Sequence, residues 1–312
     1  MPRFYFSGNR SQEVASWLRQ PIWLAEAAAI GSLMTVFRWL PLAWAFAFGR
    51  RLGALAARLS PRVDKVRANL QVVFPNAPPE SLEATTQASF RNVGVAMAEL
   101  ANVNRIWKQR TKRIEFNLLP GAVIPSSEDR TVFVTGHIGA WQLTPLIGRQ
   151  YDVVLPTIYA PEQNPYVDGQ LRRLRRAFGS PLISRDGGLR ALMRSLDRGE
   201  SMGVTVDTRL DSGEPIPFFG EDAMTNTAPS RLALRYGCDL VPIIAERLPG
   251  SRFRINVHPP VRPRNTQASS AEQARDMSAQ INALFESWIA DRPDQWLCLK
   301  RRWPKQVYSQ QT

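Results

Sequence analysis

Residues 131–142 bring together the residue types of this chain that are best suited to chemistry. Residues 131–135 are apolar or β-branched, which predicts a buried strand, and the strand stops at the turn Gly136-His137-Ile138-Gly139. An apolar helical pattern follows from Ala140. A strand that ends in a glycine turn and opens a helix is a frequent position for binding groups in α/β proteins. Because glycines let a substrate approach the backbone closely, we expect His137 and Gly139 to lie at the mouth of a site.

His137 is the strongest candidate for a general base. A single histidine beside a strand end is more often a structural hydrogen-bonding group than a catalyst. However, the chain has only two histidines. His258 precedes two prolines at a predicted strand end and has no polar companions, which favours a structural role. His137 therefore remains as the one plausible imidazole base, a group that titrates near neutral pH.

The turn around His137 resembles the His-x4-acid block of the glycerolipid acyltransferases. It is closest to the G-H-x-G-x-W-E form of the bacterial lipid A late acyltransferase family, the lauroyl and myristoyl transferases. Other blocks of that family follow at similar spacing and cover most of the chain. The matching residues are Arg67-Ala68-Asn69-Leu70, Phe74-Pro75, Tyr159-Ala160-Pro161, Asn164-Pro165, Asp168, Arg175, Arg185, Leu196 to Glu200, Asp207, Phe218-Phe219-Gly220, Pro293 to Leu297 and Arg301-Arg302-Trp303. The whole set is far more specific than any single block.

The resemblance implies a glycerol-phosphate-acyltransferase-like α/β/α fold and a transfer reaction. A fatty acyl chain would pass from a thioester, on acyl-carrier protein or CoA, to a hydroxyl of a membrane glycolipid such as a lipid A precursor. His137 would take the hydroxyl proton, and amides near Gly139 or a side chain such as Arg175 would meet the oxyanion. The implied substrate-binding residues are Gly139, Asn164, Arg175, Arg185 and Asp207. The reaction needs no metal and no cofactor other than the thioester.

The chain departs from the family pattern at one critical position, because Gln142 stands where the family has an acid. Gln142 could orient the imidazole of His137 but could not stabilise an imidazolium with a full negative charge. We therefore expect slow turnover, and about a hundredfold gain from Gln142→Glu. An alternative is a catalytically impaired or inactive member that binds glycolipid or acyl-carrier protein. Cys298, Lys300 and Arg209 also depart from the family pattern.

The charge balance predicts an anionic partner. There are 40 lysines and arginines against 27 acids, which gives a net charge of +13. A phospholipid surface, a phosphorylated acceptor, an acidic carrier protein and a nucleic acid all fit that charge. Nothing resembles a recognition helix or a base-stacking sheet, so nucleic-acid binding ranks last. Residues 165–178 predict a basic helix in which arginines 172, 175 and 176 lie within one turn of each other. We expect these arginines to bind a phosphate or phosphopantetheine group, and a solvated helix face is the alternative.

The N-terminal part is strongly apolar from Pro21 to Leu59, and between residues 27 and 49 its only charge is Arg38. That length could span a bilayer. Arg38, Pro41 and the scattered tryptophans favour instead a broken or interfacial helix pair, and a core hairpin is the alternative. We expect residues 1–59 to associate with the bacterial inner membrane, with an α/β domain of residues 60–312 on the cytoplasmic face.

The remaining pattern predicts strands that alternate with helices, which is typical of a mixed, largely parallel sheet. The expected strands cover residues 152–159, 202–207, 239–245 and 252–258. The expected helices cover residues 81–104 and 271–289. The two cysteines, Cys238 and Cys298, lie far apart and lack the spacing of a zinc site, so neither a disulfide framework nor a structural metal is predicted.

Overall fold

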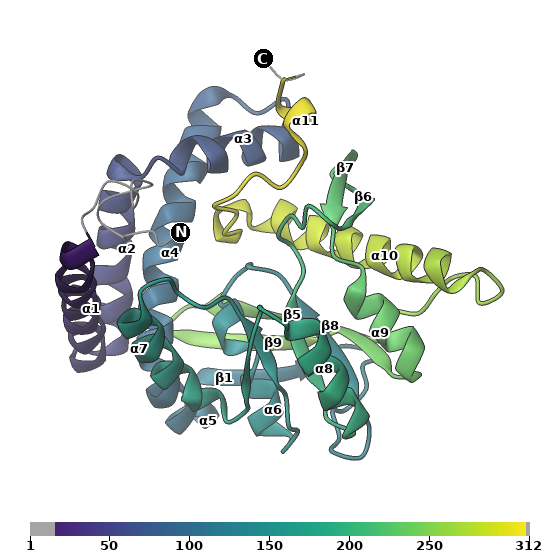
Figure 1. Cartoon of the computed structure of the whole chain (residues 1–312). Helices are drawn as coiled ribbons and strands as arrows, with labels where there is room; N and C mark the ends of the chain where they lie inside the picture. The colour runs from purple at the N-terminus through teal and green to yellow at the C-terminus, as the bar shows by residue number, and fades with distance from the viewer. Residues whose placement is uncertain (1–15, 310–312) are drawn as a thin grey trace.

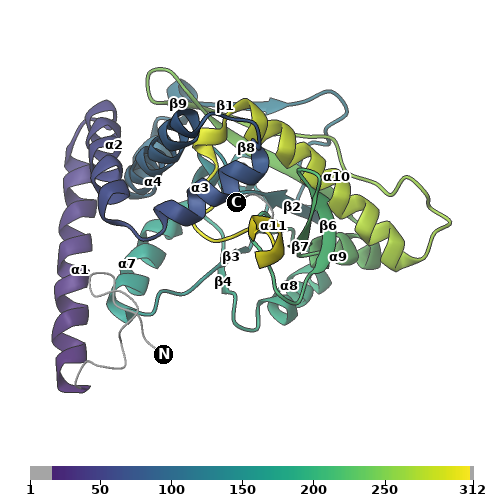
Figure 2. The same ribbon diagram turned by 90° about the horizontal axis from the view of Figure 1, so that it is seen from above.

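A computed structural model describes residues 16–309 of the chain, in which a seven-stranded sheet is covered by helices (Figures 1 and 2). Its strands are β1 (Ile114–Leu118), β2 (Thr131–Thr135), β3 (Thr157–Tyr159), β4 (Leu182–Ser184), β5 (Met202–Thr205), β8 (Asp239–Leu248) and β9 (Arg252–Val257). They are ordered β1-β9-β8-β2-β5-β3-β4. Every neighbouring pair is parallel except β8 with β9. The prediction of a mixed, largely parallel sheet is therefore confirmed.

The central strand β2 contributes side chains to two separate hydrophobic cores, because successive residues of a strand point to opposite faces. Phe133 packs in a core with α4 (Pro79–Lys108), α6 (Leu146–Gln150) and α7 (Pro165–Arg175). Val132 and Val134 pack in the other core with α8 (Gly188–Asp197), α9 (Ala228–Tyr236) and α10 (Ser270–Asp291). All five residues of β2 are buried. Helices on both faces explain why β2 is an unbroken apolar and β-branched run.

The N-terminal helix pair is present, with its break where Pro41 stands. α1 covers Ser16–Trp39 and α2 covers Leu42–Leu59. α2 crosses α4 at Gly49, Gly53 and Gly94, where a Cβ on Gly94 would lie 1.9 Å from the backbone oxygen of Gly49. Glycine on both helices is what permits this close crossing. Residues of α1 and α2 belong to the same core as Phe133 of the sheet.

Residues 27–49 do not form one spanning segment, because the chain turns between α1 and α2. This agrees with the broken helix pair that the sequence favours over a span. Within residues 16–309, no helix has both the length and the apolarity that a membrane crossing needs. The two helices lie side by side along one edge of the molecule (Figures 1 and 2). Residues 1–15 of the predicted membrane-associating segment lie outside the described part.

Several element boundaries differ from the sequence pattern. The helix expected from Ala140 is a 3-10 turn, η1 (Trp141–Leu143), followed by the short α6. Pro145 separates them, because a proline has no N–H to donate within a helix. The strand expected over residues 152–159 is reduced to β3, and β1, β4 and a separate hairpin were not predicted. That hairpin consists of β6 (Glu214–Phe218) and β7 (Glu221–Thr225).

The C-terminal segment returns across the sheet edge and is held by α3 (Val63–Val73). The buried Asn69 of α3 donates to the backbone oxygens of Cys298 (3.0 Å) and Lys300 (2.7 Å). Its Oδ1 accepts from the backbone N–H of Arg302 (3.1 Å). Nearby, η3 (Pro293–Gln295) packs on α4. Three further short helices are α5 (Arg110–Arg113), η2 (Arg176–Phe178) and α11 (Lys305–Ser309). This arrangement brings the last part of the chain over the end of β2.

Candidate active site

The centre of the candidate site is a hydrogen-bonded pair, His137 and Asp207. His137 follows β2 and Asp207 follows β5, and these strands are parallel neighbours, so both residues emerge at the same sheet edge. His137 Nδ1 lies 2.8 Å from Asp207 Oδ1. The side chain of Asp207 is 1% exposed, whereas that of His137 is 27% exposed. The acid is thus sealed from solvent while the imidazole can still be reached by a substrate.

The second oxygen of Asp207 is also occupied. Trp296 Nε1 donates to Asp207 Oδ2 over 3.1 Å. The neighbouring Leu297 donates its backbone N–H to the backbone oxygen of His137 over 2.8 Å. The segment that follows η3 therefore fixes both members of the pair. The sequence pattern singled out the block that contains Trp296 but gave no sign that the indole would bind this acid.

The pKa values of the two groups move apart. Burial works against the imidazolium, yet the charge and hydrogen bond of Asp207 outweigh burial, so the pKa of His137 is raised above 6.5. The charge of Lys300 partly opposes this rise. Burial works against the Asp207 carboxylate in the same way, but His137 and the Trp296 hydrogen bond hold its pKa below the usual value. The acid therefore stays ionised and stabilises an imidazolium on His137.

This geometry sets the tautomer of the neutral imidazole. A carboxylate can only accept, so Nδ1 carries the hydrogen and Nε2 has the lone pair. Nε2 is then the nitrogen that can accept a proton from a substrate, and the buried acid stabilises the cation that forms. The arrangement has the roles of the histidine and acid in a catalytic triad.

Gln142 does not take the position predicted for it. Its Nε2 donates to the backbone oxygen of Ala96 on α4 over 3.1 Å, and the Nδ1 of His137 is bound by Asp207 instead. The difference arises because residues 141–143 form a 3-10 turn packed on α4, which directs Gln142 toward that helix. The prediction that Gln142 orients the imidazole of His137 by hydrogen bonding is therefore wrong, because Gln142 is bonded to α4.

Gly139 is required by the backbone, but its amide is not available to an oxyanion. Its φ is +61°, and a Cβ there would lie 2.3 Å from the backbone oxygen of Ala245. The N–H of Gly139 donates to the oxygen of Gln295 (3.1 Å), and that of Ala140 donates to the oxygen of Ala245 (2.7 Å). The expectation that amides at this turn stabilise the oxyanion is corrected for these two, because both are already bonded within the fold.

A buried ion pair contacts Gln295, the residue whose backbone oxygen binds the amide of Gly139. Arg247 of β8 binds Glu99 of α4 through two hydrogen bonds of 2.6 and 2.9 Å. Glu99 is fully buried, so removing Arg247 would leave a buried carboxylate without a compensating charge. Arg247 also donates to Gln295 Oε1 over 3.3 Å. Neither Glu99 nor Arg247 was identified from the sequence, since a charge partner 148 residues away leaves no local pattern.

Asn164 is a structural residue rather than a substrate ligand. It caps the start of α7, with Oδ1 accepting from the backbone N–H groups of Tyr166 and Val167. Its Nδ2 donates to the backbone oxygen of Trp23 and to Glu26 Oε2 on α1. Asn164 is fully buried, so the predicted substrate contact is corrected. Its amide instead joins α7 to the N-terminal helices.

Arg185 follows β4 and so lies at the same edge of the sheet as His137, whereas Arg175 is the last residue of α7. Arg175 is half-buried, with its guanidinium 5.8 Å from the centre of the Tyr159 ring. Arg185 follows β4 and is exposed, and its backbone N–H donates to the oxygen of Tyr159 over 2.9 Å. Arg172 is instead paired with Asp168 at 2.8 Å. Of the three arginines in the predicted basic turn, Arg175 is thus the least exposed. Its contact with a ligand stays a prediction.

His258, the second histidine, packs against Trp288 with the ring centres 5.1 Å apart. Burial lowers the pKa of His258 to about 4. A neutral, half-buried ring stacked on an indole fits the structural role that the sequence favours for it.

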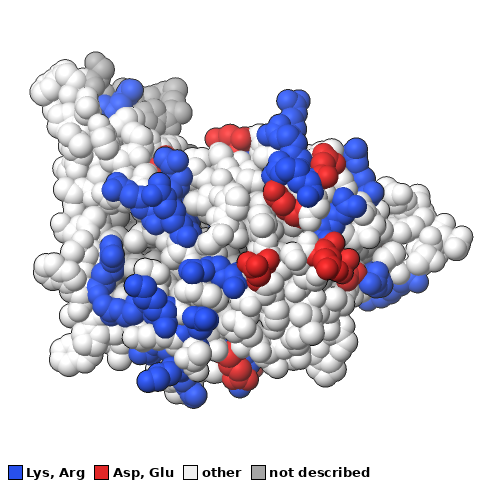
Figure 3. Space-filling view, turned by 90° about the horizontal axis from the view of Figure 1, so that it is seen from below, with Lys and Arg blue, Asp and Glu red and all other residues white. Residues whose placement is uncertain are grey.

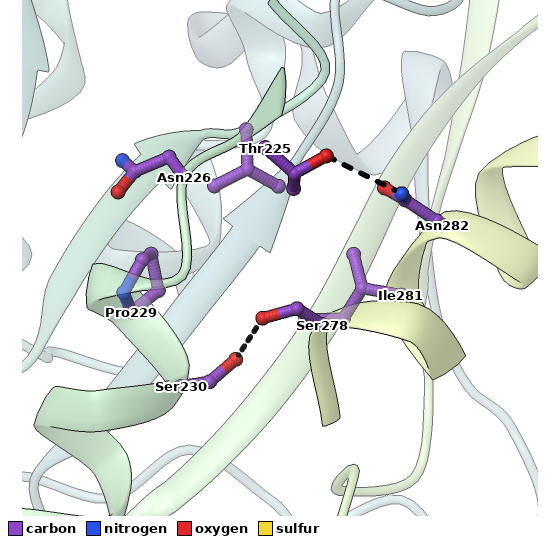
Figure 4. A pocket seen from close by; sticks show the side chains of 8 residues that line it. Thr225, Asn226, Pro229, Ser230, Ser278, Ile281 and Asn282 are labelled. Atoms are coloured by element: carbon purple, nitrogen blue, oxygen red, sulfur yellow. Dashed lines mark hydrogen bonds between the residues drawn. The ribbon is translucent and has the colours of Figure 1, made fainter. Parts of the chain in front are cut away.

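A small recess is lined by Val206, the residue before Asp207, and by residues of β7, α9 and α10 (Figure 4). Four of its polar side chains are bonded in pairs: Ser230 and Ser278 share a hydrogen bond of 2.9 Å, and Asn282 donates to Thr225 over 3.5 Å. The buried Arg302 also donates to Thr225 over 2.7 Å. These bonds tie β7, α9 and α10 together, so the recess supports the fold. Within residues 16–309, no cluster of three or more histidine, cysteine, aspartate or glutamate side chains could hold a metal.

Comparisons with known proteins identify the family of this chain. The model of the bacterial lipid A biosynthesis acyltransferase family matches residues 15–305. The lipid A biosynthesis palmitoleoyltransferase of Escherichia coli K12 is 25% identical over 266 residues, which cover 81% of this chain and 83% of that protein. The lipid A biosynthesis myristoyltransferase of the same organism is 24% identical over 298 residues, covering 91% and 88%.

One solved structure is also similar, the 1-acyl-sn-glycerophosphate acyltransferase of Thermotoga maritima. It is 14% identical, with a TM-score of 0.37, over 76% of this chain and 96% of that one. The family match covers the block around His137 and the C-terminal segment that holds Asp207. The chain therefore belongs to the bacterial lipid A biosynthesis acyltransferase family and is an O-acyltransferase.

Proposed function

We propose that the chain transfers a fatty acyl chain from an acyl-carrier-protein thioester to a hydroxyl of a lipid A precursor, with His137 as the general base. The observation that carries the proposal is the pair of His137 and the buried Asp207. The names of the relatives support an acceptor of the lipid A class. A thioester donor fits because its carbonyl is open to attack by a hydroxyl oxygen once that oxygen loses its proton.

The reaction would proceed by addition and elimination. Nε2 of His137 accepts the acceptor's proton while the oxygen attacks the thioester carbonyl, and Asp207 stabilises the resulting imidazolium. The tetrahedral intermediate then expels the thiolate, which takes the proton back from Nε2 and leaves as a thiol. A positioned base contributes about a hundred- to ten-thousand-fold. Because the amides of Gly139 and Ala140 are engaged, Arg175 is the remaining candidate of those predicted to meet the oxyanion.

The N-terminal helices provide a surface suited to a membrane interface. Among the described residues, thirteen large apolar side chains are exposed, and seven of them lie on α1 and α2. These are Trp17, Leu24, Val36, Trp39, Trp44, Leu55 and Leu59. Figure 3 shows an uncharged edge over these helices, with lysines and arginines gathered beside it. An apolar face flanked by basic residues is typical of a helix that lies in the interface. We place this face on the cytoplasmic leaflet of the inner membrane, where acyl carriers reside.

The geometry also bears on the alternative of an impaired or inactive family member. That reading depends on Gln142 as the sole partner of the base, but Asp207 already supplies the negative charge. An active enzyme is therefore favoured over a binding protein. Nothing in the site favours nucleic acid as a ligand.

The decisive experiment supplies defined acyl-carrier thioesters and a lipid A precursor to membranes that contain the full chain. Mass spectrometry of the lipids would identify the acceptor and the acyl chain. We expect His137→Ala to abolish the product while circular dichroism stays unchanged. His258→Ala is the matched control, since it removes the other imidazole. Product formation at a near-normal rate by the His137→Ala variant would exclude His137 as the base.

A further inference from the structure

A second hollow lies away from the candidate active site, where the end of α1 meets the end of α4. It encloses about 510 Å³. Apart from Ala101, its lining is polar or aromatic and consists of Thr35, Arg38, Trp39, Asn102, Asn104, Arg105, Lys108 and Gln109. Three of these side chains are cations, and no acidic residue lines the hollow. Its charge therefore complements an anion.

One of the three cations has a structural task. Arg105 donates from Nη1 to the backbone oxygen of Leu40 over 2.6 Å, and from Nη2 to the backbone oxygen of Arg38. This guanidinium braces the corner between α1 and α2. Arg38 and Lys108 are exposed, and neither has an ion pair within residues 16–309. Two cations thus face the hollow with their charge uncompensated.

The hollow adjoins the apolar face of the N-terminal helices. Trp39, which lines it, is 83% exposed. Between Arg19 and Arg38 the only charged residue of α1 is Glu26, which is fully buried. The exposed side of α1 is therefore uncharged until it reaches the hollow. Tryptophan and basic side chains at the boundary of an apolar face are typical of the headgroup level of a bilayer.

The position along α4 separates the hollow from the catalytic pair. Ala96 of α4 binds Gln142, close to His137, whereas Lys108 lies twelve residues further along the same helix. At 1.5 Å per residue that distance is about 18 Å. A ligand in the hollow is thus not the hydroxyl that His137 would deprotonate.

We propose that this hollow binds the phosphate of an anionic membrane phospholipid while the face of α1 and α2 rests on the bilayer. The inference depends on the membrane association in the proposed function. Arg38 can offer a planar fork to phosphate oxygens, and Lys108 adds a point charge. Such a contact would fix the depth and rotation of the protein on the membrane, because it anchors one end of an otherwise featureless apolar face.

The test measures partitioning of the full chain onto vesicles by sedimentation. One set contains phosphatidylcholine alone, and the other contains phosphatidylcholine with phosphatidylglycerol. We expect tighter binding to the anionic set, and a loss of about tenfold or more there for the double variant Arg38→Ala, Lys108→Ala. Its binding to the neutral set should change much less, because the choline cation of phosphatidylcholine offsets the charge of its phosphate. The control is Arg50→Ala, Arg51→Ala, which removes two exposed charges from α2 outside the hollow and should cause a clearly smaller loss.

Each other result overturns the inference in a distinguishable way. An equal loss in both double variants would mean diffuse attraction without a site. Equal binding of the wild-type chain to the two vesicle sets would rule out the headgroup site but remain consistent with the apolar contact. No binding to either vesicle would remove the membrane association as well. Competition by soluble glycerol phosphate at millimolar concentration would indicate a site for free phosphate. Acyl transfer in detergent should stay unchanged in the Arg38 and Lys108 variant, which separates this test from that of the catalytic proposal.

Discussion

Asp207 Oδ1 lies 2.8 Å from His137 Nδ1, although seventy residues separate them along the chain. The contact exists because β5 lies beside β2 and parallel to it, so the second residues after the two strands meet at one edge of the sheet. A local His-x4-acid pattern predicts a partner within one turn of the histidine. Here the partner comes from the neighbouring strand instead.

Asp207→Asn should lower kcat strongly while KM changes little. The amide can still bind Nδ1 but cannot stabilise the imidazolium, and it can favour the wrong tautomer, so a fall of about 10²- to 10⁴-fold is expected. Steady-state kinetics with an acyl-carrier thioester would measure it. Asp168→Asn is a suitable control, since it removes an acid that pairs with Arg172 on α7. Comparable kcat values for the two variants would rule out the catalytic role of Asp207.

The rate should rise with pH through the raised pKa of His137. A general base must be neutral, and Asp207 favours the charged imidazole. The acidic limb of kcat/KM should therefore lie above pH 6.5, the ordinary value for histidine. Because the charge of Lys300 lowers the pKa of His137, Lys300→Ala should move that limb to higher pH. A pH profile of kcat/KM measures the shift, and Lys305→Ala should leave it in place. A limb that moves to lower pH in Lys300→Ala would contradict this electrostatic account.

Much of the fold could be predicted from the sequence because its signals are local. β2, β8, β9, α4 and α10 are long or strongly apolar segments, and the pattern placed each within a few residues. β4 and β1 were missed because they are short and only partly buried, so they lack a clear period. The hairpin of β6 and β7 was missed because prolines interrupt β6. Such strands depend on tertiary pairing rather than on their own propensity.

The site was predicted less completely than the fold. His137 was identified correctly as the residue at the strand end, and Asp207 was placed at the same edge. That Asp207 is the hydrogen-bond partner of His137 could not be predicted, since the sequence pattern does not report which strand lies beside β2. The Asn164 amide was interpreted as a ligand because of family resemblance, whereas it caps α7 and binds α1. Short motifs thus indicate which residues matter, but not whether they contact the substrate.

Gln142→Glu should not accelerate the reaction, which reverses the expectation from sequence. Gln142 donates to the backbone oxygen of Ala96, and a carboxylate cannot donate to that oxygen. Losing a part-buried hydrogen bond and placing a charge against a carbonyl costs about 1–3 kcal/mol of stability. We expect a lower melting temperature and an unchanged or lower kcat. A hundredfold rise in kcat would show that Gln142 does reach the base during turnover.

Gly139→Ala should disturb the histidine turn. A Cβ would meet the oxygen of Ala245 at 2.3 Å, at a residue whose φ is +61°. Gly187→Ala is the matched control, because its φ is +77° but nothing lies within 4 Å of the added Cβ. The control isolates the conformational cost, about 1–3 kcal/mol. Denaturant unfolding should show a larger loss for Gly139→Ala, and only this variant should also lose activity. Equal losses would mean that the close approach to Ala245 relaxes without consequence.

The apolar face should hold the protein on membranes independently of charge. Trp39 and Trp44 are 83% and 71% exposed, and apolar burial is not screened by salt. High salt alone should therefore leave the wild-type chain in the membrane fraction, while Trp39→Ala, Trp44→Ala should shift much of it to the supernatant. Burying a large aromatic side chain contributes about 1.5–3 kcal/mol, so the partition should fall by at least tenfold. The matched control is Leu189→Ala, Leu210→Ala, which removes exposed apolar groups elsewhere on the surface. Complete release of the wild-type chain by salt would show that charge, and not this face, holds it there.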